Sequence, residues 1–399
     1  MAVCALIIGL ITPVLWNLHP RPPTFFPPRT LLSASGAGGL SCNDEALSLY
    51  LHDEAVPGLH VVCFQEGSMT FYKDAVVIPE GKTAVSVDAS QITNWESLRN
   101  LLVEHLALTP TDELHQPWAT YSGDGQRYLT EIDDGSNPID PFMGMFLVFQ
   151  GGQWIWPGVR KGFKRVISID EHRNATLETL SLYPLVLSVE GFLTMDECAQ
   201  IQTTASPSMR YADVTLMDKD KGRPASDFRT SQTTFLSSAR HSFLRSIDRK
   251  TASLVRLPVT HQEDVQVLRY GETEKYDSHH DYFEPSLYQQ DPGTLSLIQK
   301  GRRNRMITVF WYLSDVERGG ETVFPSFDKL RAAPKHLQCE SGGLRVRPEA
   351  GKVIVFYSQT PNGALDSDSL HGACPVKEGV KWAANKWVWN APMGFVQDS

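Results

Sequence analysis

Apolar residues are arranged differently in the two halves of the chain. Between residues 43 and 165, the apolar runs at 58–64 (GLHVVCF) and 145–150 (MFLVFQ) are short and nearly continuous, which favours buried strands. The segment 95–108 (WESLRNLLVEHLAL) instead has the apolar spacing of an amphipathic helix. These elements predict a small α/β accessory domain of unknown role over residues 41–170, with its folded part beginning near Asn43.

From Leu177 onward, short β-type runs separated by Gly, Pro and Asp turns dominate the pattern. An exception is the segment TMDECAQIQTTA, where Thr194 is the expected helix N-cap and Glu197 follows three residues later. The strand-like runs include DVQVLRY, RMITVFWYL, KVIVFY and KWAANKWVW. Many short strands separated by turn residues predict a mainly β domain over 177–395, a sandwich or barrel for which the double-stranded β-helix (jelly roll) with flanking helices is the most natural choice.

Residues 1–40 are expected to form an apolar N-terminus followed by a Pro-rich tether. The first sixteen residues are too few to span a bilayer comfortably but suit the core of a signal peptide, although no basic residues precede them. We therefore expect the secretory pathway, either the lumen or the membrane of the endoplasmic reticulum, with the N-terminus as cleaved signal or membrane anchor. A segment without a targeting role is the alternative. Asn174 begins an N-x-T triplet that would be a glycosylation acceptor in that pathway.

Composition and charge limit the classes of protein to which the chain can belong. With 41% hydrophobic and 21% charged residues the chain is an ordinary globular protein. Its formal net charge of -9 argues against nucleic acid as a partner, because general nucleic-acid binding needs a positive surface. Six scattered cysteines without a CxxC pair indicate neither a zinc site nor a redox motif. The sequence leaves open whether one or two disulfides form, and it does not indicate the oligomeric state.

Candidate chemistry lies in the β-rich part. In YDSHHDYF, His279 and Asp281 are two residues apart and would share one face of a strand, with His280 on the other. His371 follows about ninety residues later. Two imidazoles and one carboxylate leave three positions of an octahedron open, which suits non-haem iron(II). The ordinary alternative is that these histidines lie on the surface or in the core and bind no metal. Lys381 lies ten residues after His371, where its ammonium would pair with the far carboxylate of a metal-bound dicarboxylate.

The stretch from Pro184 to Trp389 resembles the prolyl 4-hydroxylase (alpha subunit-like) family of Fe(II)/2-oxoglutarate-dependent dioxygenases. Several sequence blocks carry the resemblance, in order and over about two hundred residues. They are RTS at 229–231, VLRYGETEKYDSHHDYF at 267–283, RMITVFWYLSDVERGGETVFP at 305–325 and AGKVIVFYSQTPNGALDSDSLHGACPVKEGVKWAANKWVW at 350–389.

By position, the resemblance implies that His279, Asp281 and His371 bind the iron, and that Lys381 binds the C5 carboxylate of 2-oxoglutarate. These four residues are the expected catalytic set.

Four further positions match residues of the family that line its pocket. Tyr270 and Thr322 correspond to residues whose hydroxyls line the cosubstrate pocket. Tyr276 and Arg305 correspond to positions that face the polypeptide, which suits a ring packing on proline and a guanidinium binding a backbone carbonyl. Barrel packing for Tyr276 and a salt bridge for Arg305 are the alternatives.

The implied reaction is hydroxylation of peptidyl proline, with release of succinate and CO2. The implied cofactors are Fe(II), 2-oxoglutarate, O2 and L-ascorbate, and the implied partner is a proline-containing polypeptide. Because Asp281 supplies the carboxylate that related halogenases lack, hydroxylation is favoured over halogenation.

Two features depart from the family pattern. The chain reads KWVW where peptide-hydroxylating relatives carry KWxH, so Trp389 replaces a histidine. The segment 284–304 (EPSLYQQDPGTLSLIQKGRRN) is longer than expected and is interpreted as a solvated loop rather than part of the substrate mouth. The same iron chemistry on peptidyl lysine, a free amino acid or a small metabolite therefore stays open. A non-catalytic jelly-roll module that binds proline-rich chains is the alternative from another class.

Overall fold

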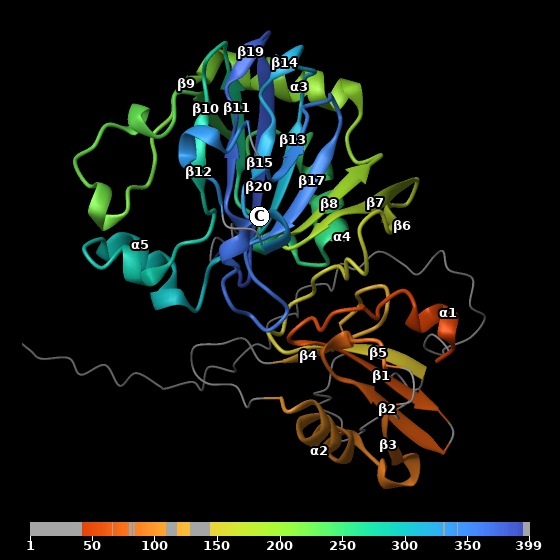
Figure 1. Cartoon of the computed structure of the whole chain (residues 1–399). Helices are drawn as coiled ribbons and strands as arrows, with labels where there is room; N and C mark the ends of the chain where they lie inside the picture. The colour runs from red at the N-terminus through yellow and green to blue at the C-terminus, as the bar shows by residue number, and fades with distance from the viewer. Residues whose placement is uncertain are drawn as a thin grey trace, which may run out of the picture.

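A computed structural model describes residues 42–393 except 66, 80, 81, 83, 109–117, 128–143, 330, 331 and 341. Within these residues, an N-terminal five-stranded sheet lies beside a β-rich C-terminal part, as Figure 1 shows in orange and in green to blue. The predicted apolar N-terminus and its tether lie outside the described residues.

The N-terminal sheet has the strand order β3-β2-β1-β5-β4 with all neighbours antiparallel. Helix α2 (Trp95–Leu106) covers one face of this sheet. Asn94 and Ser97 form a capping box at its start, and Leu98, Leu102 and Leu106 recur every fourth residue on its buried side. The predicted strands and helix of this part are all present. The other elements are α1 (Asp44–Leu47), β1 (Leu59–Gln65), β2 (Ser68–Tyr72), β3 (Val85–Asp88), β4 (Ala119–Tyr121) and β5 (Gly144–Phe149).

The C-terminal part is built on a nine-stranded sheet of order β6-β7-β8-β17-β13-β20-β11-β10-β9. Its strands are β6 (Lys164–Asp170), β7 (Arg173–Leu182), β8 (Leu185–Glu190), β9 (Arg210–Tyr211), β10 (Gln232–Leu236), β11 (Val265–Tyr270), β13 (Arg305–Tyr312), β17 (Val353–Tyr357) and β20 (Lys381–Trp389). β6 falls inside the predicted accessory domain but pairs with β7 in this sheet. The domain limits themselves stay a prediction.

A four-stranded sheet of order β12-β18-β15-β16 faces the inner side of the large sheet. Strand alternation on β13 shows how the two layers meet: Phe310 and Tyr312 point into the cluster between the sheets, whereas Val309 and Trp311 point to the opposite side. Two facing sheets with flanking helices confirm the predicted mainly β jelly-roll fold. The small sheet contains β12 (Tyr276–His279), β15 (Thr322–Phe324), β16 (Leu344–Val346) and β18 (His371–Ala373), and a separate hairpin pairs β14 (Arg318–Gly319) with β19 (Val376–Glu378).

Two helices, α3 (Met195–Ala205) and α4 (Leu244–Val255), cover the outer side of the large sheet. The predicted capping box of α3 is present: the Glu197 amide donates to the Thr194 hydroxyl over 3.1 Å, and the Thr194 amide donates to the Glu197 carboxylate over 2.9 Å. None of the helices in the described part of the chain is long and apolar enough to cross a membrane.

One hydrophobic cluster joins the N-terminal sheet to the C-terminal part. Val61 and Leu147 of the N-terminal sheet belong to the same buried cluster as Ile247 of α4 and Val355 of β17. The fold therefore has a core that is continuous across the two parts, and the inner cluster beneath the small sheet is separate from it.

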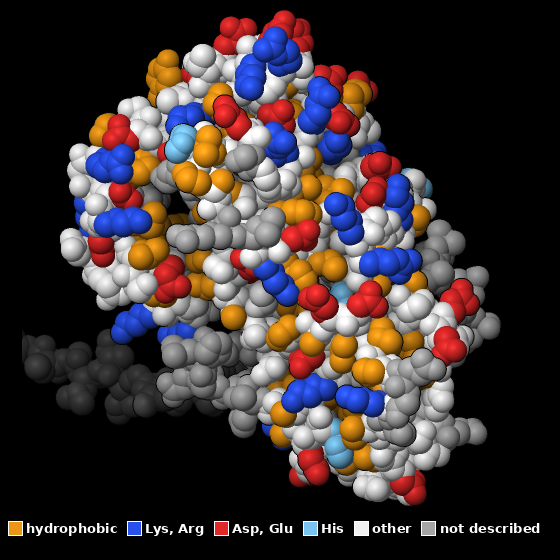
Figure 2. Space-filling model, in the orientation of Figure 1, with side chains coloured by type: hydrophobic (Ala, Val, Ile, Leu, Met, Phe, Trp, Pro, Cys, Tyr) orange, Lys and Arg blue, Asp and Glu red, His pale blue; other side chains and the backbone are white. Residues whose placement is uncertain are grey.

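The segment 284–304, interpreted from sequence as a solvated loop, is ordered into short helical turns around α5 (Pro292–Leu297). Tyr288 and Ile298 are buried against Phe283 and Trp389 in a small cluster of their own. The loop interpretation was therefore wrong, because two spaced apolar residues are enough to fix this segment on the barrel end. Over the face of the molecule in Figure 2, acidic and basic side chains are interspersed.

Candidate active site and metal centre

His279 and His371 lie directly opposite each other in the antiparallel pair of β12 and β18. Facing residues in such a pair point to the same side of the sheet, which brings the two ring centroids to 4.6 Å. Asp281 was expected on the same strand as His279, but β12 ends at His279. The chain bends there toward the large sheet, and Asp281 still reaches the two histidines.

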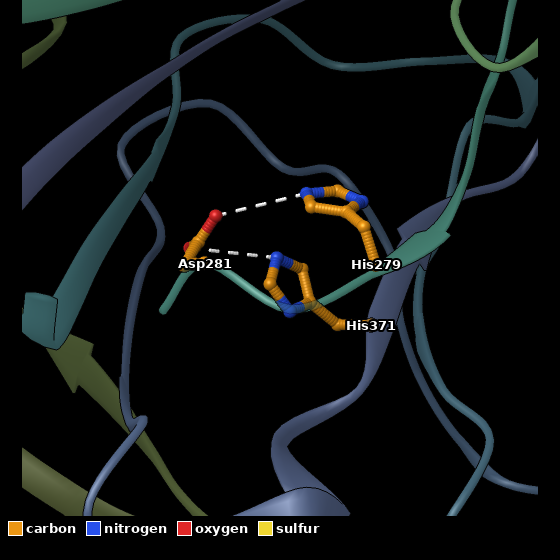
Figure 3. Close-up of side chains that lie close together, drawn as sticks. All are labelled: His279, Asp281 and His371. Atoms are coloured by element: carbon orange, nitrogen blue, oxygen red, sulfur yellow. Dashed lines mark ion pairs between the residues drawn. The ribbon is translucent and has the colours of Figure 1, made fainter. Parts of the chain in front are cut away.

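The three side chains converge on one point, as Figure 3 shows. Nε2 of His279 lies 3.6 Å from Oδ1 of Asp281, and Nε2 of His371 lies 3.5 Å from Oδ2. One potential ligand atom from each residue lies within 4.8 Å of the others. Such spacing fits atoms that share a single ion, each about 2 Å from it.

Both imidazoles are held with Nε2 free to bind a metal. Nδ1 of His279 donates to the Asp277 carbonyl and Nδ1 of His371 to the Ser369 carbonyl, each over 2.9 Å. A carbonyl oxygen only accepts, so each bond fixes the proton on Nδ1 and leaves the Nε2 lone pair exposed. Burial lowers the pKa of His371 to about 4, which keeps its ring neutral near pH 7.

Asp281 is buried, and a residue of the large sheet holds its carboxylate in place. The hydroxyl of Thr308, an inward-facing residue of β13, donates to its Oδ2 over 2.6 Å. Burial alone would raise the pKa of Asp281, but the neighbouring His371 and His279 lower that pKa by more, so the net shift is downward. The carboxylate is therefore ionised and oriented, as a metal ligand must be.

Lys381 is fully buried between the sheets at the start of β20. Its ammonium donates to the Gly320 carbonyl over 2.7 Å, but among the described residues it forms no ion pair. Burial lowers its pKa to about 7, with Glu321 acting in the opposite direction. Burying an ammonium without an ion pair costs several kcal/mol, and an anion beside it would offset that cost.

The rings of Tyr270, Phe310 and Tyr312 surround the Lys381 ammonium at 5.3 to 5.5 Å. Tyr270 pairs directly with Lys381 across β11 and β20. Thr322 is also buried and accepts a hydrogen bond of 2.7 Å from the Tyr312 hydroxyl.

Thr322 connects this pocket to the metal ligands, because it pairs with Ala373 of β18, two residues after His371. Phe356 packs on the His371 ring at 4.5 Å and belongs to the same buried cluster as Tyr270. Lys381, Tyr270 and Thr322 therefore lie in the barrel interior that also holds the histidine-aspartate set. Their roles as cosubstrate contacts stay a prediction.

Tyr276 stacks on the His279 ring with centroids 3.7 Å apart. The guanidinium of Arg229 lies 4.7 Å from the same Tyr276 ring. Arg229 is buried, donates from Nε to the Ser231 hydroxyl over 2.7 Å, and finds no hydrogen-bond partner for Nη2 among the described residues. Tyr276 thus lies beside the metal ligands, and whether it contacts a substrate stays a prediction.

Arg305 forms the salt bridge that was the alternative interpretation from sequence. Its Nε and Nη2 donate to the two carboxylate oxygens of Glu263 over 2.6 and 2.9 Å, and its guanidinium lies 3.5 Å from the Trp387 ring centroid. The indole of Trp389 donates to the same Glu263 over 2.7 Å. The contact of Arg305 with a polypeptide stays a prediction.

Sequence reasoning assigned no role to three residues of the site: Arg229, Glu263 and Thr308. Thr308 had a visible signal, since it is the polar residue at an inward-facing position of the apolar run RMITVFWYL. Arg229 lies in the quoted RTS block, but nothing local distinguishes a buried arginine from a solvated one. The sequence gives no signal for Glu263, because its hydrogen-bond donors Arg305 and Trp389 lie about forty and more than one hundred residues away.

The residues present fit the groups that the fold implies. Two imidazoles and one ionised carboxylate that converge on one point suit iron(II), and a buried ammonium in the same cavity suits a dicarboxylate cosubstrate. A zinc hydrolase would use the same three ligands but gives no reason for an unpaired lysine in the barrel.

Comparisons with known proteins agree with this donor set. A family model described as the 2OG-Fe(II) oxygenase superfamily matches residues 265–389. The chain is 37% identical over 235 residues to probable prolyl 4-hydroxylase 10 of Arabidopsis thaliana, covering 58% of this chain and 77% of that protein. It is 35% identical over 224 residues to prolyl 4-hydroxylase 5 of the same organism, covering 55% and 73%.

Among solved structures, the viral collagen prolyl hydroxylase of Paramecium bursaria Chlorella virus-1 in its 2OG complex is 25% identical. It covers 52% of this chain and 96% of that chain, with a TM-score of 0.36.

The fold, the donor set and the family match together define an iron(II)- and 2-oxoglutarate-dependent oxygenase. Within that class, the chain belongs to the prolyl 4-hydroxylase family.

Removing the Thr308 hydroxyl should weaken metal binding without removing a ligand. Thr308→Val keeps the shape of the side chain but leaves Asp281 Oδ2 without its donor. We expect the affinity for cobalt(II), followed by visible absorption, to fall about tenfold to one hundredfold. Thr308→Ser keeps the hydroxyl and should bind nearly as the wild type does. Equal affinities of the Val and wild-type chains would contradict the role given to this bond.

Proposed function

We propose that this enzyme hydroxylates proline residues in a polypeptide, with His279, Asp281 and His371 binding iron(II) and Lys381 binding the C5 carboxylate of 2-oxoglutarate. The observation that carries the proposal is the buried Lys381 ammonium, which has no anionic partner among the described residues and shares the barrel interior with the three metal ligands. A binding module without catalysis would need neither the facial ligand set nor this lysine.

When bound, the iron supplies oxygen activation coupled to decarboxylation of 2-oxoglutarate to succinate and carbon dioxide. The protein supplies position and exclusion of water. Asp277 and Ser369 carbonyls hold the two imidazoles, and the Thr308 hydroxyl holds the carboxylate. The hydroxyls of Tyr270 and Thr322 line the cosubstrate pocket beside Lys381.

Proline in a polypeptide is proposed as the substrate on the basis of the relatives, which are named prolyl 4-hydroxylases. In the proposal, Tyr276 offers an aromatic surface next to the metal ligands. Arg305 presents its guanidinium at the same end of the barrel, where Glu263 orients it. Trp389 replaces the family histidine and supports the proposed site through its bond to Glu263.

A proline-rich peptide should gain one oxygen on proline when incubated with the enzyme, iron(II), 2-oxoglutarate and L-ascorbate. Mass spectrometry of the peptide and measurement of succinate report the two products. Asp281→Ala should abolish both, because two imidazoles alone hold the metal weakly. Oxygen on lysine rather than proline would overturn the proposed substrate. Undiminished succinate from the Asp281 variant would overturn the metal assignment.

The apparent affinity for 2-oxoglutarate should fall as the pH rises above about 7. Burial gives Lys381 a pKa of about 7, whereas a bound carboxylate favours the ammonium. Below that pH the lysine is already charged. Above it the neutral amine must take up a proton on binding, so the KM for 2-oxoglutarate should rise up to about tenfold per pH unit. Lys381→Arg stays charged and should show a flat profile, and a flat wild-type profile would refute the assignment.

We propose that the enzyme works in an oxidising compartment, the lumen of the endoplasmic reticulum, with its apolar N-terminus as signal or membrane anchor. Two disulfides among the described residues, Cys42–Cys63 and Cys339–Cys374, support this proposal because disulfides persist in oxidising compartments. The N-x-T triplet at Asn174 lies on β7 with an exposed asparagine.

Expression of the full chain in a eukaryotic cell tests the compartment. We expect peptide-N-glycosidase to increase the electrophoretic mobility of the wild-type chain, because Asn174 would be glycosylated in the lumen. Asn174→Gln should abolish that shift, while Thr176→Ser preserves the triplet and should preserve the shift. A wild-type chain whose mobility does not change would contradict lumenal placement.

A further inference from the structure

The connector between β17 and β18, residues 358–370, ends on the metal ligand His371 and is a stiff segment. The Asp366 amide donates to the Ser358 carbonyl over 2.9 Å and closes the base of the connector. Nearer the tip, the Thr360 amide donates to the Ala364 carbonyl over 2.9 Å. The Ser369 hydroxyl donates to the Asp366 carbonyl over 2.7 Å. These three hydrogen bonds tie the tip of the connector to its base.

Two carbonyls at the base of the connector contact histidines of the site. The Ser369 carbonyl accepts the bond from Nδ1 of His371 that frees its Nε2. The Ser367 carbonyl accepts a bond of 3.0 Å from Nε2 of His280, the residue that lies between the other two ligands. The connector thus contacts the metal ligand His371 and the residue that directly follows the metal ligand His279.

The tip of the connector rests on the N-terminal part through backbone contacts that only glycine permits. The Gly151 amide donates to the Pro361 carbonyl over 2.8 Å. A Cβ on Gly151 would lie 2.5 Å from the backbone nitrogen of Gly363, and a Cβ on Gly58 would lie 2.5 Å from the backbone of Asn362. Figure 1 shows a blue segment descending from the large sheet onto the N-terminal sheet at this contact.

Strand β17, which leads into the connector, is held by the segment that follows the N-terminal sheet. The Trp156 amide donates to the Tyr357 hydroxyl over 3.1 Å, and Tyr357 is the last residue of β17. Tyr357 and Trp156 both belong to the hydrophobic cluster that is continuous with the N-terminal sheet. Both the entry and the tip of the connector are therefore fixed by the N-terminal part and the segment that follows it.

We propose that the N-terminal part positions the metal ligand His371, with Gly58 and Gly151 as positioning residues that hold the connector tip. The proposal rests on the proposed function, because it takes His371 as a ligand of the iron. It gives the accessory part a role in the reaction of the barrel: its docking surface sets the place of the Ser369 carbonyl, and that carbonyl sets the orientation of the imidazole.

Point variants of the full chain test this role, because deleting the N-terminal part would expose the shared core. Gly58 and Gly67 form a matched pair: both have φ of +86°, but a Cβ on Gly67 meets nothing within 4 Å. Alanine at either position must adopt the same positive φ, so the difference between the two variants reports the packing around position 58, where the contact is with Asn362.

We expect Gly58→Ala to weaken cobalt(II) binding, measured by visible absorption without 2-oxoglutarate, by about tenfold to one hundredfold. Gly67→Ala should bind cobalt(II) as the wild type does. In turnover, Gly58→Ala should raise the KM for iron(II) while leaving the KM for 2-oxoglutarate unchanged, since Lys381 lies on β20 and not on the connector. A variant that was only less stable would not raise the KM for iron(II) while leaving the KM for 2-oxoglutarate unchanged.

Gly151→Ala provides a second variant if Gly58→Ala fails to fold, because position 151 lies outside the left-handed region and its alanine meets only the steric contacts with the backbone of Asn362 and Gly363. Cobalt(II) binding equal to that of Gly67→Ala in either folded variant would overturn the positioning role. A wild-type chain that binds no cobalt(II) would overturn the proposed metal site itself, so the two failures are distinguishable.

Discussion

The antiparallel pairing of His279 with His371 is the constraint on which the rest of the site depends. A slip of one residue between β12 and β18 would turn one imidazole to the opposite face of the small sheet. Strand β18 is paired along both of its edges, since Ala373 pairs with Tyr276 of β12 and with Thr322 of β15. The large sheet then contributes the Thr308 hydroxyl that orients the Asp281 carboxylate, and the buried Lys381 ammonium.

Chemistry that depends on local order along the chain was the easiest to predict from sequence. His279, Asp281 and His371 were proposed from ligand type and spacing and Lys381 from its offset along the next strand, and the family resemblance supported all four. The capping box at Thr194 and Glu197 follows from a four-residue pattern, and the structure confirms it. The prediction that His279 and Asp281 share a strand was only partly right, because the strand ends and a bend supplies the convergence.

Features that depend on contacts between residues far apart in the sequence could not be predicted from local patterns. β6 has exposed and buried positions in a weak alternation, and its place in the large sheet is decided by pairing with β7. The segment 284–304 has the composition of a loop, yet Tyr288 and Ile298 are fixed by Trp389 from the end of the chain. The disulfide Cys339–Cys374 likewise joins residues that no spacing rule connects.

Trp389 illustrates how a departure from a family pattern acquires a physical meaning. Its indole and the Arg305 guanidinium donate to the same carboxylate, so Glu263 carries two partners at one end of the barrel. A histidine at position 389 would present a shorter side chain, while the tryptophan also fills the cluster with Phe283 and Tyr288. Through Glu263, Trp389 thereby links Arg305 to this cluster. The difference from the family pattern therefore bears on the surroundings of Arg305 and not on the metal ligands, because Glu263 binds neither the histidines nor Asp281 in the described part of the structure.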